Sequence, residues 1–226
     1  MIDQGHKAYS AILLAAGSGS RMAAACNKIF LTLADKAIFQ YGLELFLSDS
    51  DCKQVILVGK AEEKSYFTDY LSDRVCFVVG GAERQDSVRH ALKEVSEDAV
   101  MIHDGARPFV TLSELAALKA YNNAILAVPV KDTIKQVNHQ EQISQTVPRE
   151  NLWGAQTPQF FETSLIQKVH QDAHSKAFLG TDDASLVEVF SDKPITIVPG
   201  SYENIKITTP EDLIFGQAIL THRSEA

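Results

Sequence analysis

Short apolar runs alternate with longer amphipathic segments along the first 130 residues of the chain. Near-continuous apolar runs between polar or glycine residues are typical of strands that are buried on both faces of a parallel sheet. The runs that we expect to be strands cover residues 11–16, 54–59, 75–79, 99–103 and 124–130.

The segments between these runs have the spacing of amphipathic helices. Residues 83–95 place apolar side chains on one helical stripe, and Thr111 is a candidate N-cap for a helix over residues 111–123. Strands that alternate with helices are joined by right-handed crossovers. We therefore expect an α/β fold, with a doubly wound, mostly parallel sheet in a single domain that spans residues 1–226.

The alternation of strands and helices stops at residue 130. Residues 130–153 contain two strand-like pieces, at residues 132–137 and 143–147, which the polar sequence NHQEQ separates. This pattern predicts a projecting β-hairpin arm. Because an isolated hairpin is only marginally stable, we expect the arm to pack against a second subunit, and packing against its own domain is the alternative.

Composition narrows the possible partners and the location. A formal net charge of −8 argues against a broad nucleic-acid-binding surface, because such a surface requires clustered Lys and Arg side chains. No apolar run approaches the roughly 20 residues that span a bilayer, so we expect no membrane anchor. The three cysteines lack metal-ligand spacing, which predicts neither a disulfide framework nor a zinc site and fits a cytoplasmic protein.

The sequence LLAAGSGSRM at residues 13–22 changes from an apolar run into a glycine-containing loop. In wound sheets, ligands bind beyond the carboxyl ends of strands, where glycine lets backbone N–H groups approach a phosphate. Gly17 and Gly19 are candidates for this contact, and the cations Arg21 and Lys28 follow closely. The stretch matches neither the phosphate loop GxxxxGK[ST] nor the full dinucleotide fingerprint, and an ordinary tight turn is the alternative.

Two more polar motifs follow later strands. GGAERQDS at residues 80–87 permits close backbone approach, and HDGARPF at residues 103–109 puts Asp104 at the sheet edge. We expect Asp104 to bind a ribose hydroxyl or to help place Mg²⁺, and a turn-forming carboxylate paired with Arg107 is the alternative. His103 is expected to have a packing role rather than a catalytic one.

The last candidate lies in the strand-like sequence NIKIT. Lys206 alternates there with two isoleucines and so points away from both, either toward a ligand or simply into solvent. With Arg21 and Lys28, it makes three separated cations that would suit a nucleoside triphosphate. Upstream, Thr181 and Asp182 predict the N-cap and first turn of a helix.

The motifs form an ordered set: LAAGSGSRM, Lys28, GGAERQDSV, HDGARPF, VPVKDTIK, LWGAQTPQFF, TDDASLVE and NIKITTPEDL. In this set, which extends over residues 11–220, the chain resembles the 2-C-methyl-D-erythritol 4-phosphate cytidylyltransferase family. It departs from the common family pattern at Ile29 and Phe30, where Gln and an aromatic residue are usual, and at Gly105, where Ala is usual. None of these departures removes a side chain that we assign to chemistry.

The resemblance implies a Rossmann-like nucleotidyltransferase of isoprenoid precursor biosynthesis. Such an enzyme joins CTP to 2-C-methyl-D-erythritol 4-phosphate, uses Mg²⁺ and releases pyrophosphate, and the substrate phosphate attacks the α-phosphorus of CTP directly. The resemblance also implies a homodimer in which each arm crosses over, so that Thr133 and Arg149 would reach the site of the other subunit.

Roles for individual residues follow from the resemblance alone. The catalytic cations would be Arg21, Lys28, Arg149 and Lys206. The nucleotide-binding residues would be Ala15, Ala16, Gly17, Gly19, Gly81, Arg84, Ser87 and Asp104. The substrate-binding residues would be Asp104, Arg107, Thr133, Arg149, Thr157, Thr181 and Lys206. Asp104 would also lie near the metal.

Three other functions stay open on the sequence. A pentitol-phosphate (ribitol 5-phosphate) cytidylyltransferase would share the CTP half of the site, although VPVKDTIK and HDGARP favour methylerythritol phosphate. A non-catalytic nucleotide-binding protein would leave Arg21, Lys28 and Lys206 unexplained. An NAD-dependent oxidoreductase would need an acidic residue after the second strand, where this chain has Gly59 and Lys60.

Overall fold

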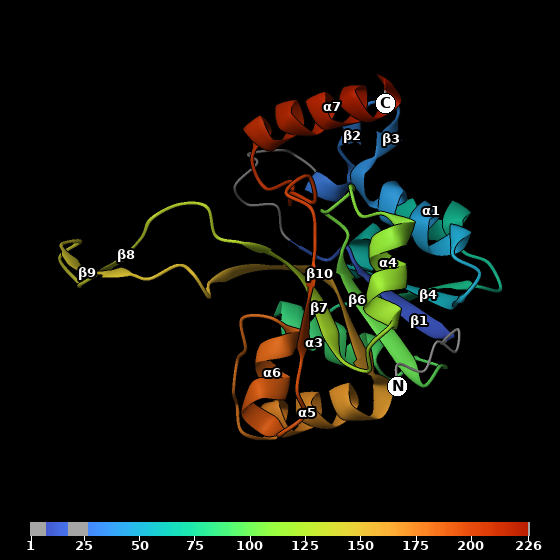
Figure 1. The fold of residues 1–226 in the computed structure, drawn as a ribbon. Coiled ribbons are helices and arrows are strands. Elements are labelled where there is room, and N and C mark those ends of the chain that lie inside the picture. The colour runs from blue at the N-terminus through green and yellow to red at the C-terminus, as the bar shows by residue number, and fades with distance from the viewer. Residues whose placement is uncertain (1–7, 18–26, 226) are drawn as a thin grey trace.

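The computed structural model describes residues 8–17 and 27–225 (Figure 1). Gly19, Arg21 and the side chain of Lys28 lie outside the described part of the chain. One sheet has the strand order β11-β7-β10-β6-β1-β4-β5. Its strands are β1 Tyr9–Leu14, β4 Cys52–Gly59, β5 Val75–Val79, β6 Ala99–Asp104, β7 Ala124–Pro129, β10 Trp153–Glu162 and β11 Thr196–Pro199.

Helices cover both faces of this sheet, as the doubly wound prediction requires. The longer helices are α1 Ile38–Ser48, α3 Arg84–Ala91, α4 Leu112–Lys119, α5 Thr163–Ser175, α6 Asp183–Phe190 and α7 Pro210–Glu225. The shorter elements are η2 Lys28–Phe30, β2 Thr32–Leu33, β3 Lys36–Ala37, η3 Ala61–Glu63, α2 Lys64–Phe67 and η4 Thr68–Tyr70. None of the helices in the described ranges combines the length and the apolar character needed to span a bilayer.

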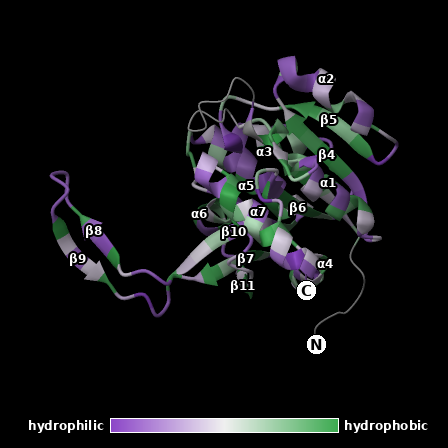
Figure 2. Ribbon diagram, turned by 90° about the horizontal axis from the view of Figure 1, so that it is seen from above, coloured by the Kyte–Doolittle hydropathy of each residue, from purple (hydrophilic) through white to green (hydrophobic). Residues whose placement is uncertain are grey.

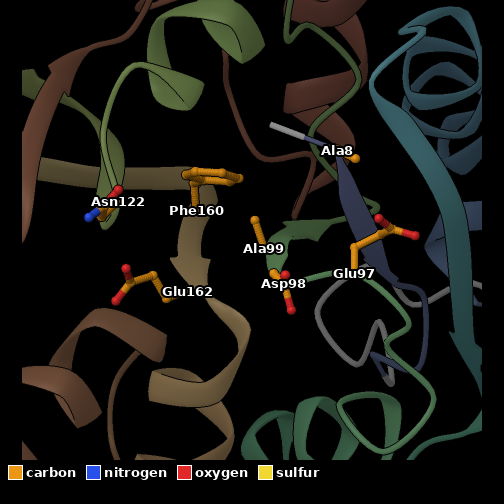
Figure 3. A pocket seen from close by; sticks show the side chains of 7 residues that line it. All are labelled: Ala8, Glu97, Asp98, Ala99, Asn122, Phe160 and Glu162. Carbon is orange, nitrogen blue, oxygen red and sulfur yellow. The ribbon is translucent and has the colours of Figure 1, made fainter. Parts of the chain in front are cut away.

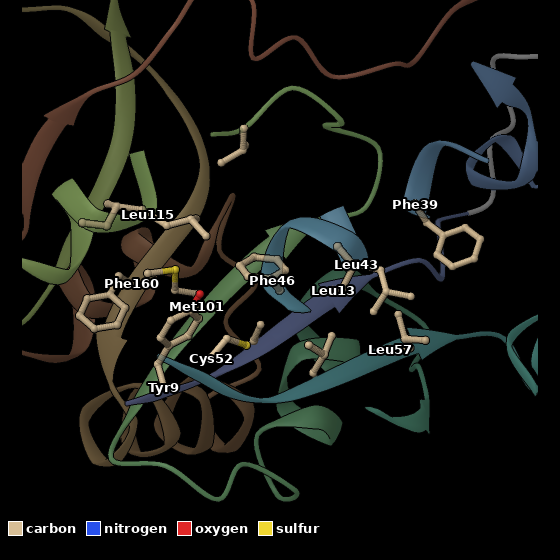
Figure 4. Close-up of a cluster of buried hydrophobic side chains, with 14 of the residues drawn as sticks. Tyr9, Leu13, Phe39, Leu43, Phe46, Cys52, Leu57, Met101, Leu115 and Phe160 are labelled. Atoms are coloured by element: carbon tan, nitrogen blue, oxygen red, sulfur yellow. The ribbon is translucent and has the colours of Figure 1, made fainter. Parts of the chain in front are cut away.

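The core is divided between the two faces because side chains alternate along a strand. Leu13 of β1 joins a buried cluster with Phe46 of α1 and Leu115 of α4 (Figure 4). Its neighbour Ile12 joins the cluster on the opposite face, with Val88 of α3. All five of these residues are fully buried. The sheet is therefore held rigidly from both sides, and its strand ends are fixed points for a site.

The five predicted strands are confirmed to within two residues at each end. The two predicted helices are shorter than expected. Helix α3 ends at Ala91 because the N–H groups of Lys93 and Glu94 bond to carbonyls only three residues back, Lys93 to His90 at 3.3 Å and Glu94 to Ala91 at 3.0 Å. Helix α4 begins after Thr111 as predicted, since Thr111 Oγ1 accepts the Glu114 N–H at 3.3 Å, but it ends at Lys119.

The apolar pattern did not predict two strands of the sheet, the edge strand β11 and the inner strand β10. Strand β10 has the more unusual position. It enters between β7 and β6 and is antiparallel to both, whereas every other neighbouring pair in the sheet is parallel. Its buried residues begin with Gln156 and Thr157, which are polar and break the run of apolar letters. The prediction of a mostly parallel sheet is correct, with this one inserted exception.

Two local predictions are wrong. Residues 204–208 form no strand; they run as an extended segment beside the loop after β6, where the Ile207 N–H donates to the Ala106 carbonyl at 2.8 Å. The N-cap of α6 is Asp182 rather than Thr181, because the Asp182 carboxylate accepts the Ser185 N–H at 2.9 Å.

The predicted arm is present as the antiparallel pair β8 Ile134–Val137 and β9 Ile143–Val147. Figures 1 and 2 show it projecting from the end of β7 and returning into β10. Almost all of its side chains are exposed, including the apolar Val137 at 52% and Ile143 at 64%. At its base the Val130 N–H donates to the Leu152 carbonyl at 3.0 Å, so the two ends of the arm are joined.

His103 is fully buried near the end of β6 and is bonded at both ring nitrogens. Its Nε2 lies 3.0 Å from the Arg107 carbonyl, and its Nδ1 lies 3.0 Å from Thr157 Oγ1. Since a carbonyl can only accept, we assign the proton to Nε2, and Nδ1 then accepts from the hydroxyl. Thr157 Oγ1 in turn accepts the Asp104 N–H at 3.0 Å. The packing role expected for His103 is thus the joining of β6 to β10 beside Asp104.

This arrangement predicts that stability depends on pH through His103. Burial lowers the pKa of His103 from 6.5 to about 4. Between these values the unfolded chain binds a proton that the folded chain does not, so stability rises with pH across this window and is flat above it. A fall in pH from 6.5 to 4 therefore removes roughly 3 kcal/mol of stability through His103. We expect denaturant unfolding at pH 4 to 6.5 to show a shallower pH slope for His103→Gln than for the wild type.

The control is His139→Gln, because His139 lies exposed on the arm and should leave the pH slope unchanged. Equal slopes for His103→Gln and the wild type would contradict the assignment.

Candidate active site

A cavity of about 500 Å³ lies at the carboxyl ends of β1, β4, β5 and β6. Loops after all four strands contribute to it, which is the usual place for a ligand in an open α/β sheet. Its lining residues are Leu14, Ala16, Gly17, Ile29, Lys60, Gly81, Ala82, Glu83, Arg84, Ser87, Asp104, Ala106 and Lys206. The cavity thus collects most of the predicted nucleotide-binding residues together with one predicted catalytic cation.

The loop after β1 contributes backbone to the cavity. The Ala15 N–H donates to the Val58 carbonyl at 2.7 Å, and the Ala15 carbonyl accepts from Asn27 Nδ2 at 2.8 Å. Ala15 is therefore buried and bonded within the fold, while Ala16 and Gly17 line the cavity. Among the predicted loop residues that the structure describes, Ala16 and Gly17 line the cavity.

The loop after β5 approaches its neighbours so closely that it requires glycine. A Cβ on Gly80 would lie 2.9 Å from the Ala16 Cβ and 2.8 Å from Ser87 Oγ. The Gly81 N–H donates to Ser87 Oγ at 3.0 Å, and that hydroxyl donates to the Glu83 carbonyl at 3.1 Å. The loop and the first turn of α3 are thereby locked together as one wall of the cavity.

Asp104, at the end of β6, is shared between two cations. Its Oδ1 accepts from Arg84 Nε at 3.1 Å, and its Oδ2 accepts from Lys206 Nζ at 2.6 Å. Burial alone would raise the pKa of Asp104, but the charges of Arg84 and Lys206 outweigh burial and hold that pKa well below its usual range. The carboxylate is therefore ionised, and three distant segments of the chain meet at it.

Arg107 does not form the side-chain pair with Asp104 that was the alternative reading of this motif. The Arg107 guanidinium donates to the Asn204 carbonyl at 2.6 Å, while its backbone N–H closes a turn on the Asp104 carbonyl at 3.0 Å. Arg107 thus anchors the extended segment that carries Lys206, two residues after Asn204. The lysine reaches the cavity because Ile207, its buried neighbour, faces the opposite way.

Arg84 is held by a second carboxylate that the sequence did not reveal. Arg84 Nη1 donates to Asp183 Oδ2 at 2.8 Å, and Asp183 Oδ1 lies 3.1 Å from His170 Nε2. Burial disfavours the charged guanidinium, but Asp183 and Asp104 outweigh it and raise the pKa of Arg84. Lys60 was missed as well; it follows β4 directly, and its place at the carboxyl end of a strand was the available signal.

The remaining predicted substrate-binding residues lie outside the main cavity, in three different places. Thr157 is buried and bonds Asp104 through its hydroxyl, as described above. Thr181 lines a smaller cavity of about 90 Å³ on the other side of Arg84. Thr133 and Arg149 are exposed on the arm, where the Arg149 guanidinium donates to the Lys131 carbonyl. Within a single chain, the structure does not bring these two arm residues to the cavity.

The donor set fits a metal carried by a ligand rather than one held by the protein alone. No group of three or more His, Cys, Asp or Glu side chains among the described residues is arranged to hold a metal ion. In the cavity, the ionised and buried Asp104 can serve as a single carboxylate donor. Mg²⁺ typically binds one or two carboxylates together with substrate phosphates and keeps several waters.

A second cavity, of about 310 Å³, lies near the amino ends of the parallel strands (Figure 3). It is lined by residues at the amino ends of β1 and β6, including Asp98, and by Glu162 at the end of the antiparallel β10. Glycine-rich loops and paired cations are found at the first cavity instead. The chemistry of the chain is therefore concentrated at the carboxyl edge.

Comparisons with known proteins agree with this geometry. The chain matches the family of 2-C-methyl-D-erythritol 4-phosphate cytidylyltransferase over residues 9–222. It is 44% identical to the protein of that name from Bacillus velezensis, over 96% of this chain and 97% of the relative. It is 46% identical to the one from Geobacillus kaustophilus, over 95% of this chain and 98% of the relative.

Solved structures give the same result. The fold is similar to the crystal structure of 4-diphosphocytidyl-2C-methyl-D-erythritol synthase from Anaerococcus prevotii, with a TM-score of 0.83 and 31% identity, covering 97% of this chain and 98% of that one. It is also similar to 2-C-methyl-D-erythritol 4-phosphate cytidylyltransferase from Francisella tularensis, with a TM-score of 0.79 and 30% identity, covering 92% and 98%. The chain belongs to the 2-C-methyl-D-erythritol 4-phosphate cytidylyltransferase family.

Proposed function

We propose that this protein transfers a cytidylyl group from CTP to 2-C-methyl-D-erythritol 4-phosphate and releases pyrophosphate. The products would be 4-diphosphocytidyl-2-C-methyl-D-erythritol and pyrophosphate, within isoprenoid precursor biosynthesis. The observation that carries the proposal is the cavity in which Arg84, Asp104 and Lys206 meet beside two glycine loops, in a chain of this family.

The reaction needs positioned charge more than an activated side chain. A phosphate monoester is already an oxyanion near neutral pH, so it can attack the α-phosphorus of CTP without a general base. His103, the histidine next to Asp104, is buried and bonded at both nitrogens, which suits a structural role. Catalysis then consists of aligning the two phosphates and neutralising the charge that develops as pyrophosphate leaves.

We assign charge neutralisation to Arg21, Lys28 and Lys206. The Lys206 side chain is 39% exposed, and its ammonium binds a carboxylate at the cavity wall. An ammonium on a flexible stem can exchange this carboxylate for a phosphate when the nucleotide enters. Asp104 then keeps its bond to Arg84 and becomes available to a ribose hydroxyl.

The backbone of the two glycine loops is the proposed binding surface for the nucleotide. Ala16 and Gly17 after β1, and Gly81 and Ser87 after β5, line the same cavity. We expect these loops to bind the edge of a pyrimidine ring and to leave no room for the larger purine ring system. Mg²⁺ bound to the triphosphate would neutralise part of its charge, and Asp104 would be a carboxylate able to help hold it.

A homodimer with exchanged arms accounts for the position of the arm residues. Thr133 and Arg149 are exposed at a distance from their own cavity, and the arm carries exposed Val137 and Ile143. Burying these apolar side chains against a second copy would stabilise the projecting hairpin. Arg149 could then hold a substrate phosphate of the other subunit with two parallel hydrogen bonds. A cytoplasmic location stays a prediction that rests on the cysteine pattern.

The first experiment measures pyrophosphate release from CTP, Mg²⁺ and 2-C-methyl-D-erythritol 4-phosphate. We expect turnover with this substrate and kcat/KM roughly 10²-fold lower with ribitol 5-phosphate, because ribitol lacks the methyl branch and its chain is longer by one hydroxyl-bearing carbon. ATP and GTP should replace CTP poorly. Binding of CTP without pyrophosphate release would refute the enzymatic function, and faster turnover of ribitol 5-phosphate would favour the pentitol-phosphate alternative.

The second prediction concerns Lys206. If its charge acts mainly in the transition state, Lys206→Ala should lower kcat by roughly 10²- to 10³-fold and change the KM for CTP much less. Steady-state kinetics with CTP as the varied substrate measures this. Lys193→Ala is the matched control, since Lys193 is exposed and outside the cavity. A Lys206→Ala enzyme with normal kcat would rule out this role.

The third prediction tests the crossed arms by mixing two inactive chains. Arg149→Ala and Lys206→Ala remove residues that would belong to one shared site but to different chains. Random mixing in equal amounts makes about half of the dimers mixed, and each mixed dimer has one intact site, so roughly a quarter of wild-type activity should return. If subunit exchange is verified and no activity returns, Arg149 serves its own subunit.

A further inference from the structure

Five ionisable side chains form a continuous chain of contacts from the core to the cavity. His170 Nε2 lies 3.1 Å from Asp183 Oδ1, and Asp183 Oδ2 accepts from Arg84 Nη1 at 2.8 Å. Arg84 Nε donates to Asp104 Oδ1 at 3.1 Å, and Asp104 Oδ2 accepts from Lys206 Nζ at 2.6 Å. From Asp183 to Lys206, carboxylates and cations alternate, so each carboxylate lies beside at least one cation.

Asp183 occupies the inner end of this chain and is anchored there. Its side chain is 1% exposed, and so is that of His170. Asp183 is the first residue of α6, and the N–H of its neighbour Ala184 donates to Gln159 Oε1 at 3.1 Å. His170 of α5 therefore holds the carboxylate itself, and Gln159 of β10 holds the backbone beside it. Asp183 does not line the main cavity, and its contact with the cavity runs through Arg84.

Arg84 depends on this anchor for its orientation. Arg84 begins α3, and its side chain reaches across to two carboxylates on different elements. A planar guanidinium bonded along two of its edges cannot rotate about its long axis. Its remaining nitrogen, Nη2, is buried without a hydrogen-bond partner among the described residues, so it does not add a third restraint.

The anchor also decides how Asp104 is shared. With Nη1 committed to Asp183, Arg84 offers Nε to a single oxygen of Asp104, and the other oxygen remains with Lys206. A guanidinium freed from Asp183 could turn and bind both oxygens of Asp104 in the bidentate geometry that arginine favours with carboxylates. Lys206 would then lose its partner, and Asp104 would be closed to a ribose hydroxyl.

We propose that Asp183 is a positioning residue for the nucleotide site: it holds Arg84 in the orientation that leaves one oxygen of Asp104 to Lys206 and to the incoming nucleotide. His170 supports it by fixing the Asp183 carboxylate from the opposite side. This inference rests on the proposed use of the cavity for CTP.

The test is a double-mutant cycle with Asp183→Asn, Arg84→Ala and the combined variant. CTP affinity is measured by calorimetry, transfer by pyrophosphate release, and folding by denaturant unfolding. We expect Asp183→Asn to weaken CTP binding by roughly 10- to 100-fold, the usual effect of losing a charge-assisted hydrogen bond. It should change the same kinetic parameter as Arg84→Ala. In the Arg84→Ala background, Asp183→Asn should cost less than about twofold, because its route to the nucleotide is already broken.

A second variant covers the case in which Asp183→Asn fails to fold because Arg84 loses its buried counter-charge. Arg84→Lys keeps a positive charge between the two carboxylates, but one ammonium cannot hold both in a fixed plane. Its CTP affinity should be close to that of Arg84→Ala. An Arg84→Lys protein that binds CTP as the wild type does would overturn the proposal, since charge alone would then suffice.

The matched control is Asp182→Asn, one residue earlier. Asn is also a good N-cap, so α6 should stay capped, and Asp182 bonds Ser185 and Gln159 rather than Arg84. Its CTP affinity should equal that of the wild type. Additive losses from Arg84→Ala and Asp183→Asn would overturn the positioning role. Wild-type protein that binds CTP without transfer would refute only the enzymatic function, because the cycle in CTP affinity would still decide the role of Asp183; wild-type protein that binds no CTP would refute both.

Discussion

The Asp104 carboxylate, shared between Arg84 and Lys206, is the interaction on which the site depends. The three residues come from α3, from the end of β6 and from the extended segment before α7, and they are far apart in sequence. Burying an ionised carboxylate costs free energy unless cations and hydrogen bonds compensate it. Asp104 can therefore stay ionised only where the segments that carry Arg84 and Lys206 meet it. The fold therefore stabilises an assembled cavity wall before any ligand arrives.

The sheet meets this requirement through its geometry. The carboxyl ends of the parallel strands β1, β4, β5 and β6 lie on the same side of the sheet. The loops that follow these strands therefore line one cavity. The antiparallel β10 adds a different contribution: through Thr157 it bonds both His103 and the Asp104 N–H. Through Asn204, whose Nδ2 donates to the Thr157 carbonyl at 3.0 Å, the same strand steadies the segment that carries Lys206. One strand thus supports two of the three partners at the carboxylate.

The sequence predicted what depends on local pattern and missed what depends on contacts between distant segments. Apolar runs identified β1, β4, β5, β6 and β7, and polar letters between two strand-like pieces identified the arm. Asp104 and Lys206 were recognised as candidates, but not as partners, because no local pattern reports that residues 104 and 206 meet. The sequence did not indicate a role for Asp183 for the same reason. Strand β10 was missed because its buried residues include the polar Gln156 and Thr157, which interrupt the apolar run. Gly19, Arg21 and the side chain of Lys28 lie outside the described residues, so their assignments stay predictions.

The way the arm leaves the sheet has a consequence for how this architecture can change. Both ends of the arm emerge from β7 and β10, which are neighbours in the sheet, and the Val130–Leu152 bond closes its base. In topological terms the arm is a long insertion at the turn of an ordinary β-hairpin. Its length and sequence can therefore vary without moving the register of the strands that carry His103, Asp104 and Thr157. Changes in the arm therefore leave the cavity wall of the same chain in place, and under the proposed exchange of arms only Thr133 and Arg149 would connect the arm to the chemistry of a site.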